Sequence, residues 1–120
     1  MITVYGIPNC DTCRKARKWL KEQDIDHVFH DFRKDGLRQE QVDGWVDAVG
    51  WETLLNRRGT TWRKLPDADK SGVDAPNAAA LMTANPTLIK RPVFEGLENI
   101  LVGFSTESQA ALSASKGVAV

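Results

Sequence analysis

The first 32 residues place the strongest constraint on the fold, because they alternate between strand-like and helix-like segments. Residues 2–6, ITVYG, are rich in β-branched and aromatic side chains and predict a short strand that ends at Gly6 and Pro8. Residues 11–23 repeat their apolar side chains at intervals of three and four, which is typical of an amphipathic helix. Residues 27–32, HVFHDF, predict a second strand. A strand, a crossover helix and a strand within about thirty residues form a βαβ unit, whose two strands are parallel.

The middle of the chain predicts a block of helices. A first helix ends at Gly50, a suitable C-terminal cap, and has an apolar face made of Val42, Trp45, Val46 and Val49. Residues 51–56, WETLLN, predict a short second helix, and the polar residues 66–76 predict an exposed loop. An Ala-rich helix follows through Met82 and stops at Asn85 and Pro86.

The C-terminal part predicts two more strands and a helix. Residues 92–96, PVFEG, and 99–104, NILVGF, form a predicted hairpin. Ser105 and Thr106 open a last helix, in which Gln109 is placed to complete a capping box on Thr106. The order β-α-β, helices, β-β-α predicts a four-stranded mixed sheet flanked by helices. We therefore expect an α/β, thioredoxin-like fold in one domain, residues 1–120, with a helical insertion at about 37–88.

Composition limits the classes of protein to consider. Sixteen Lys and Arg residues balance sixteen Asp and Glu residues, so no net charge favours direct binding of nucleic acid or of a membrane surface. No segment approaches the roughly 20 apolar residues of a membrane-spanning helix, and the N-terminus has no signal-peptide pattern. Two cysteines are too few for a disulfide scaffold. We expect a cytoplasmic protein, in which a cysteine pair is reactive or metal-binding rather than a permanent disulfide.

The two cysteines, Cys10 and Cys13, lie where the first strand gives way to the first helix. The free N–H groups of the first helical turn and the positive end of the helix dipole face this position, and Arg14 and Lys15 add cations one turn further on. Such surroundings lower the pKa of a thiol, and the thiolate is the nucleophile. We expect Cys10 to attack a substrate and Cys13, one turn along the same face, to resolve the mixed disulfide.

Two other readings of the cysteines remain open. Both can be small buried apolar residues. Cys10 and Cys13 with His27 and His30 also resemble a two-Cys, two-His zinc site. The histidines are separated by two residues rather than three to five, and in a strand residues three apart point to opposite faces. We therefore expect no metal site.

Two basic stretches supply candidate binding residues. In residues 89–94, IKRPVF, Pro92 precedes the third strand of a thioredoxin-like sheet, where proline is typically cis and faces the active cysteine. Pro92 would expose backbone to a peptide-like thiol substrate, and Arg91 would stabilise the Cys10 thiolate or bind a carboxylate or oxyanion. The alternative is an ordinary Lys-Arg pair at a strand edge.

The second stretch, residues 56–65, NRRGTTWRKL, gathers cations around a glycine turn. It predicts either a solvated loop or an anion-binding rim, with Arg57 or Arg58 reaching inward. Asn9, next to Cys10, completes the predicted substrate-binding residues.

Four segments together resemble the arsenate reductase/Spx (ArsC/Spx) family: PNCDTCRKARKWL, NRRGTTWRKL, NPTLIKRP and LVGFS. The resemblance covers roughly residues 1–115, and FHDFRKDGL, RGTTWRKL and AALMT are most similar to the YffB-like reductase branch. It implies a thioredoxin-like fold with a helical insertion, a reactive thiol at Cys10 and an active-site arginine at Arg91. A further family arginine matches Arg58 or Arg57.

Branches of the family do different work. Arsenate reductases of this type hold the oxyanion with three arginines, the third of which lies near the last strand. In this chain that region reads LVGFSTES and contains no arginine. These enzymes also commonly lack a second cysteine at the position of Cys13. Losing one such contact costs about 1.5–3 kcal/mol, so we expect little arsenate reduction. Spx-type regulators carry C-x-x-C as a redox switch and bind the RNA polymerase α subunit, with a glycine matching Gly50 at that contact.

The sequence therefore predicts a cytoplasmic thiol–disulfide oxidoreductase. Cys10 attacks, Arg91 stabilises the thiolate, and Cys13 or glutathione resolves the intermediate. We expect no bound cofactor, glutathione as co-substrate, and glutathione, a small disulfide or glutaredoxin as partner. The alternatives are a redox-switched regulator that binds the RNA polymerase α subunit, and an arsenate reductase.

Overall fold

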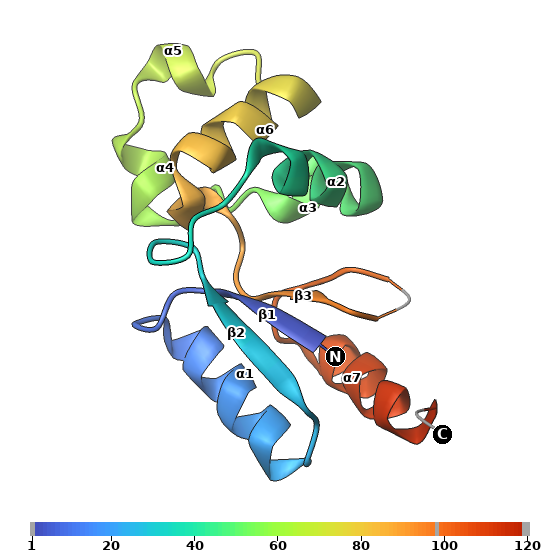
Figure 1. Cartoon of the computed structure of the whole chain (residues 1–120). Helices are drawn as coiled ribbons and strands as arrows, with labels where there is room; N and C mark the ends of the chain where they lie inside the picture. Colours follow the sequence, from blue (N-terminus) through green and yellow to red (C-terminus); the bar gives the residue numbers. More distant parts are fainter. Residues whose placement is uncertain (1, 98, 119–120) are drawn as a thin grey trace. The chain divides into compact units, whose positions relative to one another are not determined.

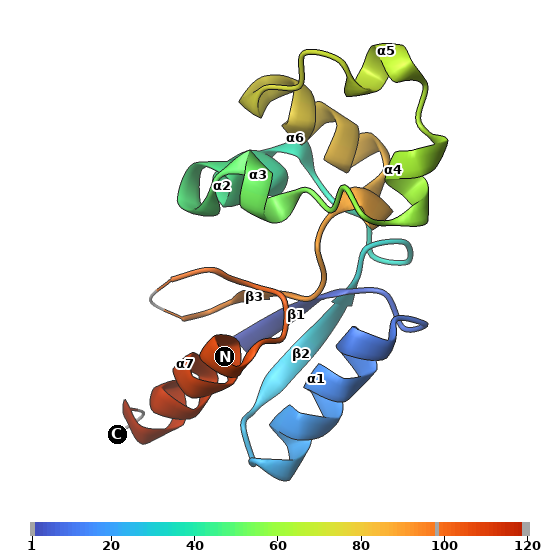
Figure 2. The same ribbon diagram turned by 180° about the vertical axis from the view of Figure 1, so that it is seen from behind.

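The chain forms a four-stranded mixed sheet with helices, which confirms the predicted α/β, thioredoxin-like class (Figure 1). The computed structural model describes residues 2–97 and 99–118. Contacts divide the chain into two units: residues 1–35 with 91–120, which hold the sheet, and residues 36–90, which are helical. Figure 2 gives the view from behind.

The sheet has the strand order β2-β1-β3-β4. Strand β1 (Ile2–Gly6) pairs in parallel with β2 (His27–Asp31), and α1 (Asp11–Glu22) is the crossover between them, which confirms the βαβ unit. On its other side β1 pairs antiparallel with β3 (Val93–Glu95), and β3 pairs with β4 (Leu101–Val102). The hairpin of β3 and β4 is thus as predicted, with shorter strands.

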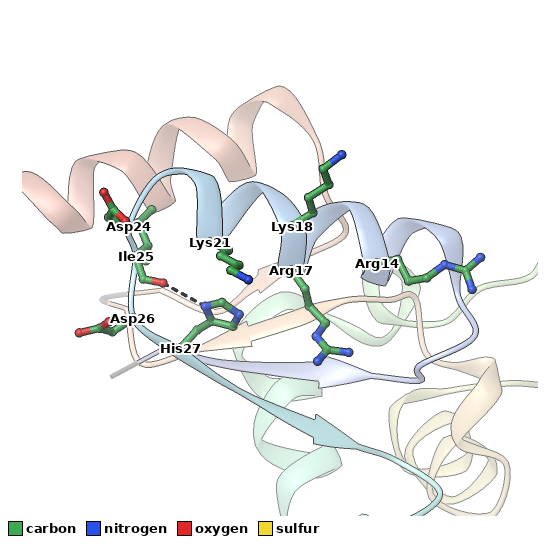
Figure 3. A pocket seen from close by; sticks show the side chains of 8 residues that line it. All are labelled: Arg14, Arg17, Lys18, Lys21, Asp24, Ile25, Asp26 and His27. Carbon is green, nitrogen blue, oxygen red and sulfur yellow. Dashed lines mark hydrogen bonds between the residues drawn. The ribbon is translucent and has the colours of Figure 1, made fainter.

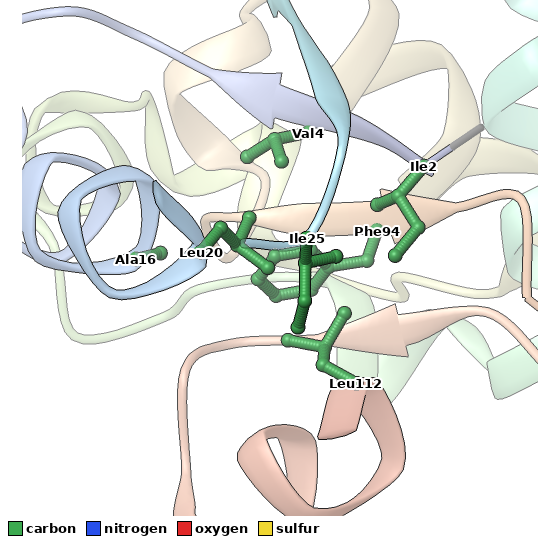
Figure 4. Packing of buried hydrophobic residues seen from close by; sticks show 7 residues of the cluster. All are labelled: Ile2, Val4, Ala16, Leu20, Ile25, Phe94 and Leu112. Atoms are coloured by element: carbon green, nitrogen blue, oxygen red, sulfur yellow. The ribbon is translucent and has the colours of Figure 1, made fainter. Parts of the chain in front are cut away.

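The core of the sheet unit joins one face of the sheet to two helices (Figure 4). Strands β1 and β3 place Val4 directly opposite Phe94 in the antiparallel register. Helix α1 and helix α7 (Thr106–Val118) pack on this same face, and their buried residues belong to one cluster. The cluster consists of Ile2, Val4, Ala16, Leu20, Ile25, Phe94 and Leu112.

The start of α7 differs by one residue from the predicted capping box on Thr106. The Ser105 hydroxyl accepts a hydrogen bond from the backbone N–H of Ser108 at 3.2 Å, and the Ser105 carbonyl accepts from the N–H of Gln109 at 3.0 Å. Ser105 is therefore the capping residue. Ser and Thr are both preferred N-cap residues, and the spacing to Gln109 favoured Thr106 although serine is the better cap of the two.

The helical unit contains α2 (Gln39–Val49), α3 (Trp51–Leu54), α4 (Thr60–Lys64), α5 (Asp67–Lys70), α6 (Ala75–Ala84) and a 3-10 turn η1 (Pro86–Leu88). Its buried side chains include Val42, Trp45, Val46, Leu54, Ala78 and Met82. Gly50 ends α2 with φ +87°, a left-handed value that glycine adopts without strain, as its predicted capping role requires. Within the described residues, no helix has the length and apolar character needed to cross a membrane.

Two segments of the helical unit were predicted wrongly. Residues 66–76 are not all loop, because α5 forms one helical turn and α6 begins at Ala75. Asp74 caps α6 by accepting a hydrogen bond from the N–H of Asn77 at 3.0 Å. The basic stretch at residues 56–65 contains α4 rather than a glycine turn alone.

The core predicts a large loss of stability for Leu20→Ala. Leu20 is fully buried between α1 and the sheet, so the substitution removes apolar contacts and leaves a cavity. We expect the free energy of unfolding to fall by about 2–5 kcal/mol, measured by chemical denaturation. The control is Lys15→Ala, an exposed site on the same helix, which should change stability by less than about 0.5 kcal/mol. Equal losses in both variants would contradict this packing.

Candidate active site

The two thiols lie at the N-terminus of α1. Cys10 is the residue before the helix, has extended backbone angles, and its carbonyl accepts the N–H of Arg14 at 2.9 Å. The Cys10 side chain is half-buried, whereas Cys13, in the first turn, is fully buried. Both are free thiols. The strand ends and the helix begins where the sequence predicted, and this junction positions the pair.

Several contacts compete to set the pKa of Cys10. Burial of the thiol raises the pKa, but the backbone N–H of Cys13 and the Arg91 side chain both donate hydrogen bonds that lower it. The Cys13 thiol and the positive charge of Arg91 lower it further, and the net pKa is below the ordinary thiol value. The contact from a first-turn N–H agrees with the predicted role of the helix N-terminus.

The pKa of Cys13 moves in the opposite direction, to about 11. Burial is the main cause, and the negative charge of the Cys10 thiolate and its hydrogen bond with Cys13 add to it. A backbone hydrogen bond from Ile7 and the charge of Arg91 oppose the rise only in part. The Cys10 thiol therefore ionises before the Cys13 thiol, which at neutral pH remains a protonated hydrogen-bond donor.

Of the cations that the sequence suggested for Cys10, Arg91 is the one whose hydrogen bond and charge lower its pKa. Arg14 and Lys15 are not among the groups that shift the Cys10 pKa. The Arg14 guanidinium forms an exposed ion pair with Asp11 instead. The expectation for Arg91 agrees with these contacts, and a contribution from Arg14 and Lys15 stays a prediction.

Strand pairing brings Arg91 to the cysteines. Tyr5 of β1 lies opposite Val93 of β3 in an antiparallel register, so the residues just after Tyr5 run alongside those just before Val93. Arg91 is partly buried and its Nε atom lies below the surface. The short turn from β1 to Cys10 therefore meets a guanidinium from the other end of the sequence.

The peptide bond between Arg91 and Pro92 is cis, as expected. Pro92 is buried, and its carbonyl accepts a hydrogen bond from the N–H of Gly103 at 2.8 Å. Proline has no N–H, and its carbonyl is already bonded within the sheet unit. Pairing of a substrate with the backbone of Pro92 itself therefore has less support than the sequence suggested.

The other predicted binding residues have different surroundings. Asn9 is exposed in the turn before Cys10. Arg57 and Arg58 are exposed residues of the helical unit, and the Arg57 guanidinium lies 5.7 Å from the centre of the Trp51 ring. The backbone N–H of Arg58 donates to Asn56 Oδ1 at 3.0 Å. A substrate-binding role for Asn9, Arg57 and Arg58 stays a prediction.

The two histidines have other contacts. Nδ1 of His27 lies 2.9 Å from the carbonyl oxygen of Ile25, and the His30 ring lies 4.8 Å from the Tyr5 ring. In the part of the chain that the structure describes, no group of three or more His, Cys, Asp or Glu side chains is arranged to hold a metal ion.

Gly6 is a site residue that the sequence identified only as the end of a strand. An added Cβ at Gly6 would lie 2.5 Å from Cys13 Sγ, closer than side chains approach one another. The absence of a side chain at Gly6 therefore makes room for the buried thiol. The only signal in the sequence was a glycine shortly before a cysteine pair, which many strand ends share.

Comparisons with known proteins agree with this architecture. The model of the ArsC family matches residues 5–112. An uncharacterized protein of Haemophilus influenzae is 46% identical over 114 residues, which covers 94% of this chain and 100% of that protein. The global transcriptional regulator Spx of Streptococcus pyogenes is 27% identical over 109 residues, covering 89% of this chain and 81% of the regulator.

Solved structures are similar over nearly the full length. The protein named YffB superimposes with a TM-score of 0.89 at 45% identity, covering 93% of this chain and 99% of that one. An arsenate reductase (ArsC) related protein from Brucella melitensis has a TM-score of 0.74 at 50% identity, with 92% of each chain covered.

The contact between Arg91 and Cys10 predicts that Arg91→Gln slows alkylation of Cys10. Without the cation and its hydrogen bonds the pKa of Cys10 rises, and a smaller fraction of the thiol is ionised at neutral pH. We expect iodoacetamide to modify Cys10 several-fold more slowly near neutral pH, with the pH profile displaced upward. Lys90→Gln, which removes the exposed neighbouring charge, is the control. An unchanged profile in Arg91→Gln would contradict the assignment.

The contact at Gly6 predicts that Gly6→Ala destabilises the chain. The new methyl group would displace Cys13 Sγ from its buried position, and overpacking of this kind costs about 1–3 kcal/mol. Gly44→Ala is the matched control, because Gly44 lies inside α2 with nothing near its added Cβ and should become neutral or more stable by up to about 1 kcal/mol. Denaturant unfolding of both variants measures the difference. A neutral Gly6→Ala would mean that Cys13 moves aside at no cost.

Proposed function

The chain belongs to the ArsC family, whose model matches residues 5–112 of its 120 residues, and from this premise we propose that it is a thiol–disulfide oxidoreductase that uses glutathione. The observation that carries the proposal is the opposite displacement of two neighbouring pKa values, with that of Cys10 lowered and that of Cys13 raised to about 11. Opposed values in one small cluster are typical of groups with different chemical roles.

In the proposed first step the Cys10 thiolate attacks one sulfur of a disulfide, R–S–S–R. The substrate S–S bond breaks, a mixed disulfide forms between Cys10 and RS, and the other half leaves as a thiolate that takes a proton from water. The Arg91 guanidinium stabilises the thiolate before attack and remains next to the sulfur that becomes neutral. The Cys13 thiol donates a hydrogen bond to the attacking sulfur.

In the second step Cys13 attacks Cys10 of the mixed disulfide and releases the second RS group. Cys13 must first lose its proton, and formation of the mixed disulfide makes this easier because the Cys10 negative charge that raises the Cys13 pKa is gone. The charge of Arg91 continues to favour the Cys13 thiolate. The protein is now oxidised by two electrons, as the Cys10–Cys13 disulfide. Two molecules of glutathione reduce it back to the dithiol and are themselves oxidised to glutathione disulfide.

Glutathione can also resolve the mixed disulfide directly, in which case Cys13 acts only as a hydrogen-bond donor. Glutaredoxin is a proposed alternative reductant. We place the reaction in the reducing cytoplasm, where two glutathione molecules can restore the dithiol. No bound cofactor enters either route.

Arsenate reduction has less support than disulfide reduction. The relative from Brucella melitensis carries the words arsenate reductase in its name, but LVGFSTES contains no third arginine for an oxyanion. Regulation of RNA polymerase is the second candidate, because an Spx protein is a relative at 27% identity and the glycine expected at that contact, Gly50, is exposed. The reductase is preferred because the Brucella protein, whose name relates it to a reductase, is more similar than the Spx protein, at 50% against 27% identity.

A glutathione-coupled assay with hydroxyethyl disulfide tests the proposed function. We expect Cys10→Ser to lose roughly a hundredfold or more in rate, because the nucleophile is absent. Cys13→Ser is the companion variant. It should retain part of the activity if glutathione resolves the intermediate. If Cys13 resolves it, the variant should accumulate the mixed disulfide between Cys10 and the mercaptoethanol half of the substrate, which mass spectrometry detects. Equal turnover by wild type and Cys10→Ser would defeat the proposal.

A further inference from the structure

A basic groove follows α1 from Arg14 towards the start of β2 and takes no part in the mechanism above (Figure 3). It lies in the sheet unit, along α1 and the start of β2, and has a volume of about 550 Å³. The residues that line it are Arg14, Arg17, Lys18, Lys21, Asp24, Ile25, Asp26 and His27. We call this surface the α1 groove.

The positive charge of the α1 groove is a local feature. The sequence of α1, DTCRKARKWLKE, contains five basic and two acidic residues, whereas the whole chain has sixteen of each kind. Four of the five basic residues line the groove, and Lys15 does not. On a chain of zero net charge, such a cluster attracts anions to one part of the surface.

Two of these cations are available to a partner. Arg14 pairs with Asp11, and Lys18 lies 4.0 Å from Glu22. Among the described residues, neither Arg17 nor Lys21 has a carboxylate within ion-pair distance. The Arg17 guanidinium lies 4.1 Å from the centre of the Phe29 ring, which holds its orientation without neutralising its charge. Figure 3 shows Arg17 and Lys21 extending from α1 on the side of β2.

The length of the α1 groove determines the kind of ligand that fits it. Residues 14 to 21 of a helix span about 10 Å, and their first member is only about 6 Å along the axis from Cys10. One small oxyanion cannot contact cations spread over this length. A peptide or protein segment with carboxylates beside its own cysteine can contact them while its disulfide reaches Cys10. Asp24 and Asp26 lie at the other end of the groove and limit the attractive part to α1.

We propose that the α1 groove docks an acidic segment next to the reactive cysteine of a protein or peptide disulfide, so that acidic disulfides are the preferred substrates of Cys10. This inference rests on the proposed function, because it assumes that Cys10 exchanges with disulfides. Nucleic acid fits less well, since the chain has no net positive charge and two aspartates lie in the groove.

Two synthetic peptides test the proposal. Each carries one cysteine in a mixed disulfide with thionitrobenzoate, and the cysteine is flanked by glutamates in one peptide and by glutamines in the other. The Cys10 thiolate attacks the peptide sulfur, the peptide becomes disulfide-bonded to Cys10, and the coloured thionitrobenzoate anion leaves. For the full chain we expect the second-order rate constant to be about tenfold larger for the acidic peptide at low salt, and this ratio to fall toward one as salt is added.

The variant is Arg17→Gln with Lys21→Gln. The matched control is Arg33→Gln with Lys34→Gln, which removes one arginine and one lysine from exposed positions of the same unit outside the groove. We expect the groove variant to lose the preference for the acidic peptide and the control to retain it. The ratio of the two rate constants is the readout, because it cancels any change in the intrinsic reactivity of Cys10.

A ratio near one in wild type, or an equal loss of preference in the variant and the control, would overturn the proposal. Binding of a labelled DNA oligonucleotide through Arg17 and Lys21, without a preference for the acidic peptide, would overturn it as well. These results differ from failure of the proposed function, in which neither peptide would react faster with wild type than with Cys10→Ser.

Discussion

The contact between the Arg91 guanidinium and the Cys10 sulfur determines what the thiol pair can do. It joins segments from opposite ends of the sequence, and it exists because β1 and β3 pair antiparallel with Tyr5 opposite Val93. The same pairing places Val4 against Phe94 in the core beneath α1 and α7. The apolar packing that stabilises the sheet therefore also fixes the position of the charge beside the nucleophile, and a change in register would separate them.

One helical turn is enough to give the two cysteines different chemistry. Cys10 precedes the helix, is half-buried and accepts hydrogen bonds from Arg91 and from the N–H of Cys13. Cys13 is inside the turn and fully buried against Gly6, so desolvation dominates its pKa. The thiolate is thus stabilised on one sulfur at the expense of the other. The negative charge of Cys10 adds to the effect of burial on the Cys13 pKa until that charge is consumed by reaction.

Features that depend on neighbouring residues could be predicted from the sequence, and those that depend on distant contacts could not. The strands and α1 follow from local patterns, and the cis bond at Pro92 was expected from its place before the third strand of the predicted sheet. Arg14 was predicted to act on Cys10 because it is close in sequence. Its guanidinium instead pairs with Asp11, and the sequence does not show which of the two neighbours the side chain contacts. The space at Gly6 appears only when β1 meets α1. Helices α4 and α5 were missed because segments of four or five residues are too short to show a helical period.

The charge pattern of α1 is unfavourable for the helix itself. Arg14 and Lys18, and Arg17 and Lys21, are like-charged pairs four residues apart, and each costs about 0.2–0.5 kcal/mol in an isolated helix. Burial of Leu20 in the core offsets this cost, since a fully buried leucine contributes about 1.5–3 kcal/mol. Charge repulsion within a helix, offset by burial elsewhere, is expected where the charged surface binds a partner. Because the repelling side chains line the α1 groove, an acidic partner would relieve the repulsion as it brings its disulfide to the thiolate.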